Sequence, residues 1–408
     1  MGFSLLSAGA GVVELLCIAL VALTPGSVAR AAQFGAKSDT WNQGWLRYDP
    51  VTIHLGSARV DEYQASLSSI CIQNANTQVS SILNSTAKEL QRGLSGILSL
   101  SVPPPVRVAA NCATQAAAGE IRIVSEGNAV TDKASEGFSL KTTGCGKDLG
   151  QNESDACVQI SSATDRGALT GAFSLLRHLQ TNQSVSSLDI SQTPAAALRI
   201  WDLWDNYDRS VERGYGGLSV FDWTEISKGH ISERYTDFAR LLASVGINAI
   251  AFLNVNACGN DNQMLLSSDT LDNLAVVANI MSEWGIDFII TPCFASPKLV
   301  GKLKTADPLD AGVRSWWNNI SLTIATRIPT FKGFLIKADS EGEPGPGTYG
   351  RNQSQGANML AEALSPINAS VFWRAFEYSG PGDRATLAYK TFIPYVACIL
   401  VKWGGYVD

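Results

Sequence analysis

The sequence lacks the features that mark several large classes of protein. Only 17% of its residues are charged, the formal net charge is −6, and no basic patch is present that would attract a nucleic acid backbone. The apolar segment 11–23 is too short to span a bilayer comfortably. The cysteine spacings fit no zinc pattern, and residues 33–180 contain no glycine-rich nucleotide loop. We therefore expect no nucleic acid partner, no membrane partner, no metal and no cofactor.

The composition is that of a globular protein. The chain has 408 residues, 45% of them hydrophobic, and its mean hydropathy is close to zero. This length suffices for two domains or for one barrel with an appended domain. His178 has apolar residues on both sides, and we expect a structural role for it.

The N-terminus indicates secretion. The apolar core is followed by Pro25, Gly26 and the small-residue stretch 29–31, which together predict a signal peptide over residues 1–31. A buried N-terminal helix is the alternative. Asn-X-Ser/Thr sequons, which are glycosylated only in a secretory pathway, occur at six positions: Asn84, Asn152, Asn182, Asn319, Asn352 and Asn368. We expect a secreted, extracellular glycoprotein.

Six cysteines lie between the predicted signal peptide and the C-terminal segment. In an oxidising compartment they could form disulfides, and Cys145 with Cys157 could join the strands of a hairpin, although the sequence does not fix the pairing. The six are Cys71, Cys112, Cys145, Cys157, Cys258 and Cys293.

Residues 33–185 predict a compact α/β domain. Short strands are expected at 119–127, 137–143 and 157–163, and helices at 77–94 and 165–179.

Residues 190–394 repeat one strand–helix unit about five times. Apolar runs of strand length occur at 197–203, 247–256, 287–294, 333–339 and 370–376, and helical patterns follow at 232–245, 269–284, 311–327 and 354–366. This alternation predicts a parallel sheet. The expected fold is an N-terminal α/β domain followed by an incomplete (β/α)8 TIM barrel, with a doubly wound sheet as the alternative.

Polar and aromatic residues stand where these strands end, which is where barrel enzymes hold their active sites. Glycoside hydrolysis needs a carboxylic acid to protonate the leaving oxygen and a second carboxyl group as base or nucleophile, and indole rings stack on sugars. An arginine and a lysine would suit a substrate carboxylate. The candidates at these strand ends are Trp204, Asp205, Asn206, Asn254, Asn256, Lys337, Asp339, Glu341 and Arg374.

Four long stretches resemble the α-glucuronidases of glycoside hydrolase family 67. They are "WDNYDRSVERGYGGLSVFDW" (204–223), "RYTDFARLLASVGINAIAFLNVNA" (234–257), "FASPKLVGKLKTADPLDAGVRSWW" (294–317) and "GFLIKADSEGEPGPGTYGRNQSQGANMLAEAL" (333–364). The resemblance begins near residue 45 and continues to about Pro394.

The resemblance implies an enzyme that removes 4-O-methyl-glucuronic acid from xylo-oligosaccharides with inversion, so glucuronoxylan-derived oligosaccharides are the expected partners. Position by position, it makes Glu341 the general acid and assigns Lys337 and Arg374 to the substrate carboxylate. It places Trp204, Asn254 and Asn256 in the pocket. Asp339 and Glu343 are subsidiary, the former shaping the turn or tuning the acid.

The chain also departs from the family pattern. Asp202 and Leu203 replace a polar pair before Trp204, and after Pro394 the unrelated segment 395–408 stands where the family continues. The family's base carboxylates and dimerisation region belong to that continuation, so the sequence predicts a truncated barrel of doubtful activity. The alternatives are a non-catalytic module that binds uronic acids or xylo-oligosaccharides, and an inactive fragment.

Overall fold

The computed structural model describes residues 41–51, 57–74, 78–114, 117–127, 134–145, 156–259, 262–374, 392–393 and 396–399. The predicted signal peptide, residues 1–31, lies outside them. The chain divides into two compact units, Met1–Arg47 and Tyr48–Asp408. In the first, the described element is the 3-10 helix η1 (Trp41–Arg47). Among the described residues, no helix is both long and apolar enough to cross a membrane.

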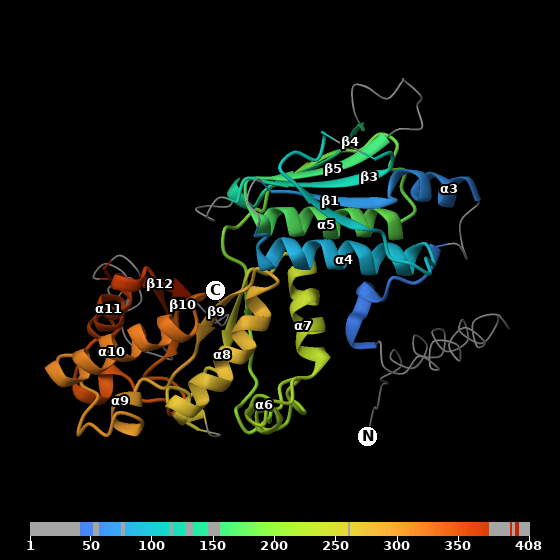
Figure 1. Cartoon of the computed structure of the whole chain (residues 1–408). Coiled ribbons are helices and arrows are strands. Elements are labelled where there is room, and N and C mark those ends of the chain that lie inside the picture. The colour runs from blue at the N-terminus through green and yellow to red at the C-terminus, as the bar shows by residue number, and fades with distance from the viewer. Residues whose placement is uncertain are drawn as a thin grey trace, which may run out of the picture. The chain divides into compact units, whose positions relative to one another are not determined.

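The second unit begins with a mixed six-stranded sheet in the order β2-β1-β3-β5-β4-β6. The first four strands in this order are parallel, whereas β4 runs antiparallel to both β5 and β6. Figure 1 shows helix α5 under the sheet with α4 beside it. The bounds are α3 (Ser57–Ser66), β1 (Ser69–Gln73), α4 (Ser81–Ile97), β2 (Val106–Ala109), β3 (Glu120–Ser125), η3 (Ala134–Glu136), β4 (Phe138–Gly144), β5 (Ala156–Ser162), α5 (Asp165–Gln180) and β6 (Asp189–Gln192).

The five elements predicted in this part of the chain are present. Helices α4 and α5 begin after Ser80 and Thr164, whose hydroxyl oxygens accept hydrogen bonds from the backbone N–H groups of Leu83 and Gly167. Strands β1, β2 and β6 and helix α3 were not predicted. Strand β2 alternates between exposed and half-buried residues, so it lacks the continuous apolar pattern on which the prediction relied.

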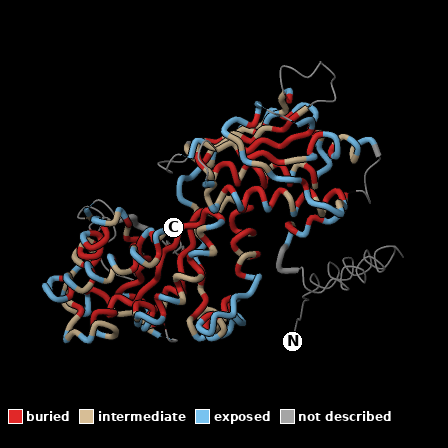
Figure 2. The backbone as a smooth tube through the Cα atoms, in the orientation of Figure 1, coloured by how far each residue is buried: buried red, intermediate tan, exposed pale blue. Residues whose placement is uncertain are grey.

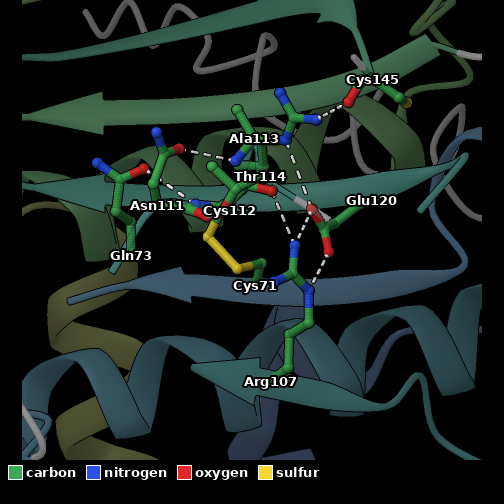
Figure 3. Close-up of a disulfide and its surroundings, with 10 residues drawn as sticks. Cys71, Gln73, Arg107, Asn111, Cys112, Ala113, Thr114, Glu120 and Cys145 are labelled. Carbon is green, nitrogen blue, oxygen red and sulfur yellow. Dashed lines mark hydrogen bonds and ion pairs between the residues drawn. A yellow bond between two sulfur atoms is a disulfide. The ribbon is translucent and has the colours of Figure 1, made fainter. Parts of the chain in front are cut away.

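All six predicted cysteines form disulfides. Cys145 pairs with Cys157 across the β4–β5 hairpin, as suggested by the sequence, and Cys258 pairs with Cys293. Figure 3 shows the third disulfide, between Cys71 and Cys112.

A buried carboxylate lies between two of these disulfides. Arg107 donates two hydrogen bonds to Glu120, at 2.7 and 2.9 Å, and one to the carbonyl oxygen of Cys112 (Figure 3). Arg122 lies 3.5 Å from the same carboxylate and donates to the carbonyl oxygen of Cys145. Glu120 is fully buried, and its charge is therefore compensated by two guanidinium groups.

The second sheet has the order β12-β11-β10-β9-β8-β7, and every neighbouring pair is parallel. In Figure 2 its central strands are buried, while exposed residues concentrate on the surrounding helices and loops. The bounds are β7 (Ile200–Asp202), α6 (Trp223–Ser227), α7 (Glu233–Ser244), β8 (Ala249–Phe252), η4 (Asn262–Met264), α8 (Ser268–Ser282), β9 (Asp287–Ile290), α9 (Ser296–Leu299), α10 (Ala311–Arg327), β10 (Phe331–Lys337), η5 (Pro346–Tyr349), α11 (Gln353–Leu364), η6 (Ser365–Ile367), β11 (Ser370–Arg374) and β12 (Val396–Ile399).

The two faces of this sheet distinguish a barrel from a doubly wound fold. On one face, Ala249, Ala251, Ile289, Leu335 and Phe372 pack with Val255, Ile200 and Trp204, all from strands or from the loops that follow them. On the other face the aromatic side chains meet the helices, as where Phe334 packs against Trp317 of α10 at a ring distance of 5.4 Å. Helices thus cover one face only, and the sheet forms half of a barrel.

The five predicted strands are all present, and one strand was missed. Strand β12 pairs with β11 and lies inside segment 395–408, which the sequence had left outside the fold. The resemblance was followed only to about Pro394, so it placed no strand there.

Buried ion pairs join the first sheet's helices and loops to the second sheet. Arg240 of α7 donates to both oxygens of Glu89 on α4 at 2.7 Å, and Arg240 is fully buried. The hydroxyl of Tyr48 donates to the same carboxylate at 2.5 Å. Glu136 is similarly buried and accepts hydrogen bonds from Arg166 and Asn248.

Candidate functional site

The predicted site residues gather at the carboxyl ends of strands β7, β8, β10 and β11. Lys337 and Arg374 are the last residues of β10 and β11 and stand opposite each other in the strand register. In a parallel sheet this pairing puts both side chains on the same face. The face is the one that holds the apolar cluster of Leu335 and Phe372, so the two cations lie just above the half-barrel interior.

Lys337 is a buried cation with two polar partners. It is 3% exposed, and its Nζ donates to Asn256 Oδ1 at 2.5 Å and to Glu341 Oε2. A buried ammonium group is tolerated only where such partners compensate for lost hydration. Lys337 therefore joins the loop after β8 to the turn after β10.

Glu341 lies on a tight turn that presents its carboxylate to solvent. Ser340 accepts a hydrogen bond from the N–H of Glu343 at 3.0 Å, and the φ angles of Glu341 and Gly342 are +50° and +87°. A positive φ is uncommon for a residue other than glycine and is found often at functional sites. The side chain of Glu341 is 37% exposed, so an approaching ligand can reach it.

Asp339 turns away from this group. Its Oδ2 accepts hydrogen bonds from the N–H of Gly347 and from Gln353 Nε2, both at 2.9 Å. Gln353 Oε1 in turn accepts from Trp373 Nε1 at 2.8 Å. These contacts fix the loop after β10, in agreement with a role in shaping the turn. Its assignment to substrate binding stays a prediction.

Asn254 is fully buried, and protein groups occupy both ends of its amide. Its Nδ2 donates to Asn206 Oδ1 at 3.0 Å and to the carbonyl oxygen of Glu212 at 2.9 Å, while its Oδ1 accepts from the N–H of Asn256 at 3.0 Å. These bonds orient Asn256 and hold the loop between β7 and α6. The predicted contact of Asn254 with substrate stays untested.

Trp204 lies beneath Arg374. The guanidinium carbon of Arg374 is 5.8 Å from the centre of the indole ring, and Trp204 Nε1 donates to Asp202 at 3.0 Å. Desolvation raises the pKa of Asp202, whereas the hydrogen bond from Trp204 and the charge of Arg374 lower it. Asp202, which stands where the family has another residue, thus becomes part of the site.

Glu343 lies between the turn that carries Glu341 and the Cys258–Cys293 disulfide. Its Oε2 accepts from the N–H of Cys258 at 3.2 Å. Burial raises the pKa of Glu343, and the nearby charge of Glu341 adds to this, while the Cys258 N–H and the Lys337 charge lower it. Glu343, Cys258 and Cys293 place three potential metal ligands within 4.8 Å of one another, but the two sulfurs are bonded to each other.

Three buried side-chain polar atoms at this edge have no hydrogen-bond partner within the part of the chain that the structure describes. They are Arg374 Nη1, Asn256 Nδ2 and Ser340 Oγ. Buried polar atoms are nearly always paired, so unpaired donors beside the Lys337 ammonium indicate a place for an acceptor that carries negative charge.

Arg213 was missed by sequence reasoning. Its Nη2 donates to Glu341 Oε2 at 3.1 Å although 128 positions separate the two residues. Asn262 was missed as well. Together with Asn206, which the sequence had placed at the end of the first strand, it supports the same loop through hydrogen bonds of 2.8 to 3.0 Å. The signal in the sequence for Arg213 is that it falls in the first stretch that resembles the family.

The comparisons with known proteins identify a family. The model of the glycosyl hydrolase family 67 N-terminus matches residues 44–175, and that of the family 67 middle domain matches residues 178–397. Alpha-glucuronidase A of Aspergillus tubingensis is 37% identical over 368 residues, which are 88% of this chain and 40% of that protein. Probable alpha-glucuronidase A of Aspergillus clavatus is 36% identical over 86% of this chain and 40% of its own length.

Among solved structures, a GH138 enzyme targeting pectin rhamnogalacturonan II superposes with a TM-score of 0.51 at 11% identity. The match covers 81% of this chain and 38% of that one, and it shows similarity of fold alone. The chain spans about 40% of the length of the curated relatives above. Because the two family models together account for most of the sequence, the chain belongs to glycosyl hydrolase family 67.

Proposed function

We propose that the protein is an α-glucuronidase that acts on the α-1,2 link between (4-O-methyl)glucuronic acid and xylo-oligosaccharides derived from glucuronoxylan, with inversion. The relatives that carry the name alpha-glucuronidase are more than twice as long as this chain, so the proposal rests on the site as well as on the family.

One observation supports the choice of an acidic sugar above all others. Arg374 Nη1 and Asn256 Nδ2 are buried donors without acceptors among the described residues, and Lys337 bonds to Asn256 and is paired in register with Arg374. A uronate carboxylate offers two oxygens to such donors and compensates for the positive charge. A neutral sugar offers these donors no charged oxygen.

Glu341 is the proposed general acid. It is exposed at the mouth of the half-barrel and hydrogen-bonded to Lys337, so it lies next to the proposed carboxylate site. An inverting enzyme also needs a base that activates water. We assign this role to none of the described residues.

Binding without hydrolysis is the second candidate. It is favoured because the residues proposed to bind the carboxylate are all described, whereas no described residue is assigned as the catalytic base. Secretion is proposed with either function. It is supported by the three disulfides and by exposed asparagines at the sequons Asn84, Asn182 and Asn319.

The experiment is to measure glucuronic acid released from aldouronic acids by the purified chain and by Glu341→Gln, together with binding of the same oligosaccharides. Release that is lost in the variant supports the hydrolase. Binding without release in either protein supports the binding module. Absence of both contradicts the proposed function.

A further inference from the structure

Glu341 is held by two cations that approach the same oxygen atom. Lys337 Nζ and Arg213 Nη2 both donate to Oε2, the latter at 3.1 Å. The two donors differ in their surroundings, because the Lys337 side chain is 2% exposed and that of Arg213 is 56% exposed. Lys337 is therefore fixed in the protein, whereas Arg213 can exchange its partner.

The backbone beside Arg213 is held rigidly. The carbonyl oxygen of Glu212 accepts from Asn206 Nδ2 and from Asn254 Nδ2, both at 2.9 Å, and its N–H donates to Trp204 at 2.8 Å. The loop thus holds the backbone of Arg213 in place, and the largely exposed guanidinium reaches the turn that carries Glu341.

The charges around Glu341 conflict with its proposed role. Lys337 and Arg213 favour its ionised form, and Glu343 on the same turn opposes it. Glu212 lies 3.8 Å from Arg213 and weakens its positive field slightly. A general acid, however, must carry a proton when the substrate is bound. A change in its charged partners on binding would resolve the conflict.

We infer that Arg213 is a positioning residue that controls the protonation of Glu341: it pairs with the carboxylate in the empty site and leaves it when a uronate binds. The inference rests on the proposed function. The uronate carboxylate then accepts hydrogen bonds from the cations that Glu341 shared, and Glu341 takes up one proton from solvent. Arg213 stays protonated throughout, so the net change is one proton bound per uronate.

The first test needs no ligand. The carboxyl carbon of Glu341 is followed by ¹³C NMR during a pH titration of the wild type, Arg213→Gln and Arg213→Lys. The variant with Gln is expected to titrate about 0.5 to 1 pH unit higher than the wild type, since the lost cation is partly exposed. The variant with Lys is expected to restore the wild-type midpoint. Equal midpoints in wild type and Arg213→Gln would overturn the inference.

The second test measures protons taken up when D-glucuronate binds, from calorimetry at pH 5 in two buffers with different ionisation enthalpies. The wild type is expected to take up a proton, Glu341→Gln none, and Arg213→Gln less than half the wild-type amount. Binding with equal proton uptake in wild type and Arg213→Gln would overturn the proposal. If no protein binds D-glucuronate, the proposed function fails, and the NMR titration still decides whether Arg213 pairs with Glu341.

Discussion

Lys337 Nζ lies 2.5 Å from Asn256 Oδ1, and this hydrogen bond connects the end of strand β10 with the loop after β8. Because the same ammonium group also bonds to Glu341, the proposed general acid and the proposed carboxylate site share one buried cation. A change at Lys337 should therefore affect both.

Replacement of Lys337 by methionine tests the carboxylate site. Methionine fills a similar volume without the charge, and we expect the dissociation constant for aldouronic acids to rise about 100-fold or more, the usual cost of removing one partner of a buried charge pair. Binding is measured by calorimetry. Lys332→Met, on the same strand but half exposed, is the control and should bind as the wild type does. Unchanged affinity in Lys337→Met would contradict the assignment.

Replacement of Glu343 by glutamine tests the raised pKa of this side chain. A carboxyl whose pKa is raised above its ordinary value of 4.5 binds protons more readily in the folded state, so stability falls as pH rises through that window. The loss of stability caused by the ionised Glu343 is absent below about pH 4.5 and complete above the raised pKa. Glutamine keeps an oxygen for the Cys258 N–H and removes the charge.

We therefore expect Glu343→Gln to be more stable than the wild type at pH 7, by up to about 1 kcal/mol, with the difference vanishing toward pH 4. Urea unfolding at several pH values measures it. The exposed Glu283→Gln serves as the control. A gain that is constant across pH would show that the effect is unrelated to titration.

Replacement of Asn254 by alanine tests how far the site depends on the loop that supports it. Asn254→Ala leaves the Asn206 oxygen and the Glu212 carbonyl each with one donor fewer, and we expect a loss of about 1 to 3 kcal/mol in the free energy of unfolding. Hydrogen exchange should also speed up in residues 204–222. If exchange there stays as slow as in the wild type, the loop does not depend on this side chain.

Replacement of Arg240 by methionine tests how much the Arg240–Glu89 ion pair between α7 and α4 contributes to stability. Arg240→Met leaves a buried carboxylate without its main partner and is expected to destabilise the protein by about 3 to 5 kcal/mol. The double variant Arg240→Met/Glu89→Leu removes the Glu89 charge and should recover part of the loss, since Asp237, which also pairs with Arg240, keeps its carboxylate. Urea denaturation of both variants measures the effect. Equal destabilisation of the two would show that the unpaired charge is not the cause.

The sequence predicted the parts of the fold that follow from local pattern. Buried strands such as residues 333–339 were recognised from their apolar runs. Lys337 and Arg374 were predicted as site residues because they are the polar residues that follow two of these runs. Strand β12 was not predicted, because residues 395–408 were interpreted as lying outside the fold, and pairing with β11 is a long-range contact that no local pattern encodes.

The contacts within the site were less accessible to sequence reasoning. Asn254 was expected to line the pocket, which stays a prediction, and its hydrogen bonds to a loop more than 40 residues away were not predicted. Arg213 reaches Glu341 only because three asparagines fix the path of that loop. No local pattern encodes such long-range hydrogen bonds, and they required the folded structure.

The most direct test of the carboxylate site compares D-glucuronate with D-glucose as ligands of the wild-type chain by calorimetry at pH 7. The two sugars differ only in the group at C6, so their difference in affinity measures the contribution of the carboxylate. We predict that D-glucuronate binds at least about tenfold more tightly, because a charge-assisted hydrogen bond is worth about 1.5 to 3 kcal/mol. Equal affinities would contradict the proposal that Lys337, Arg374 and Asn256 bind a uronate.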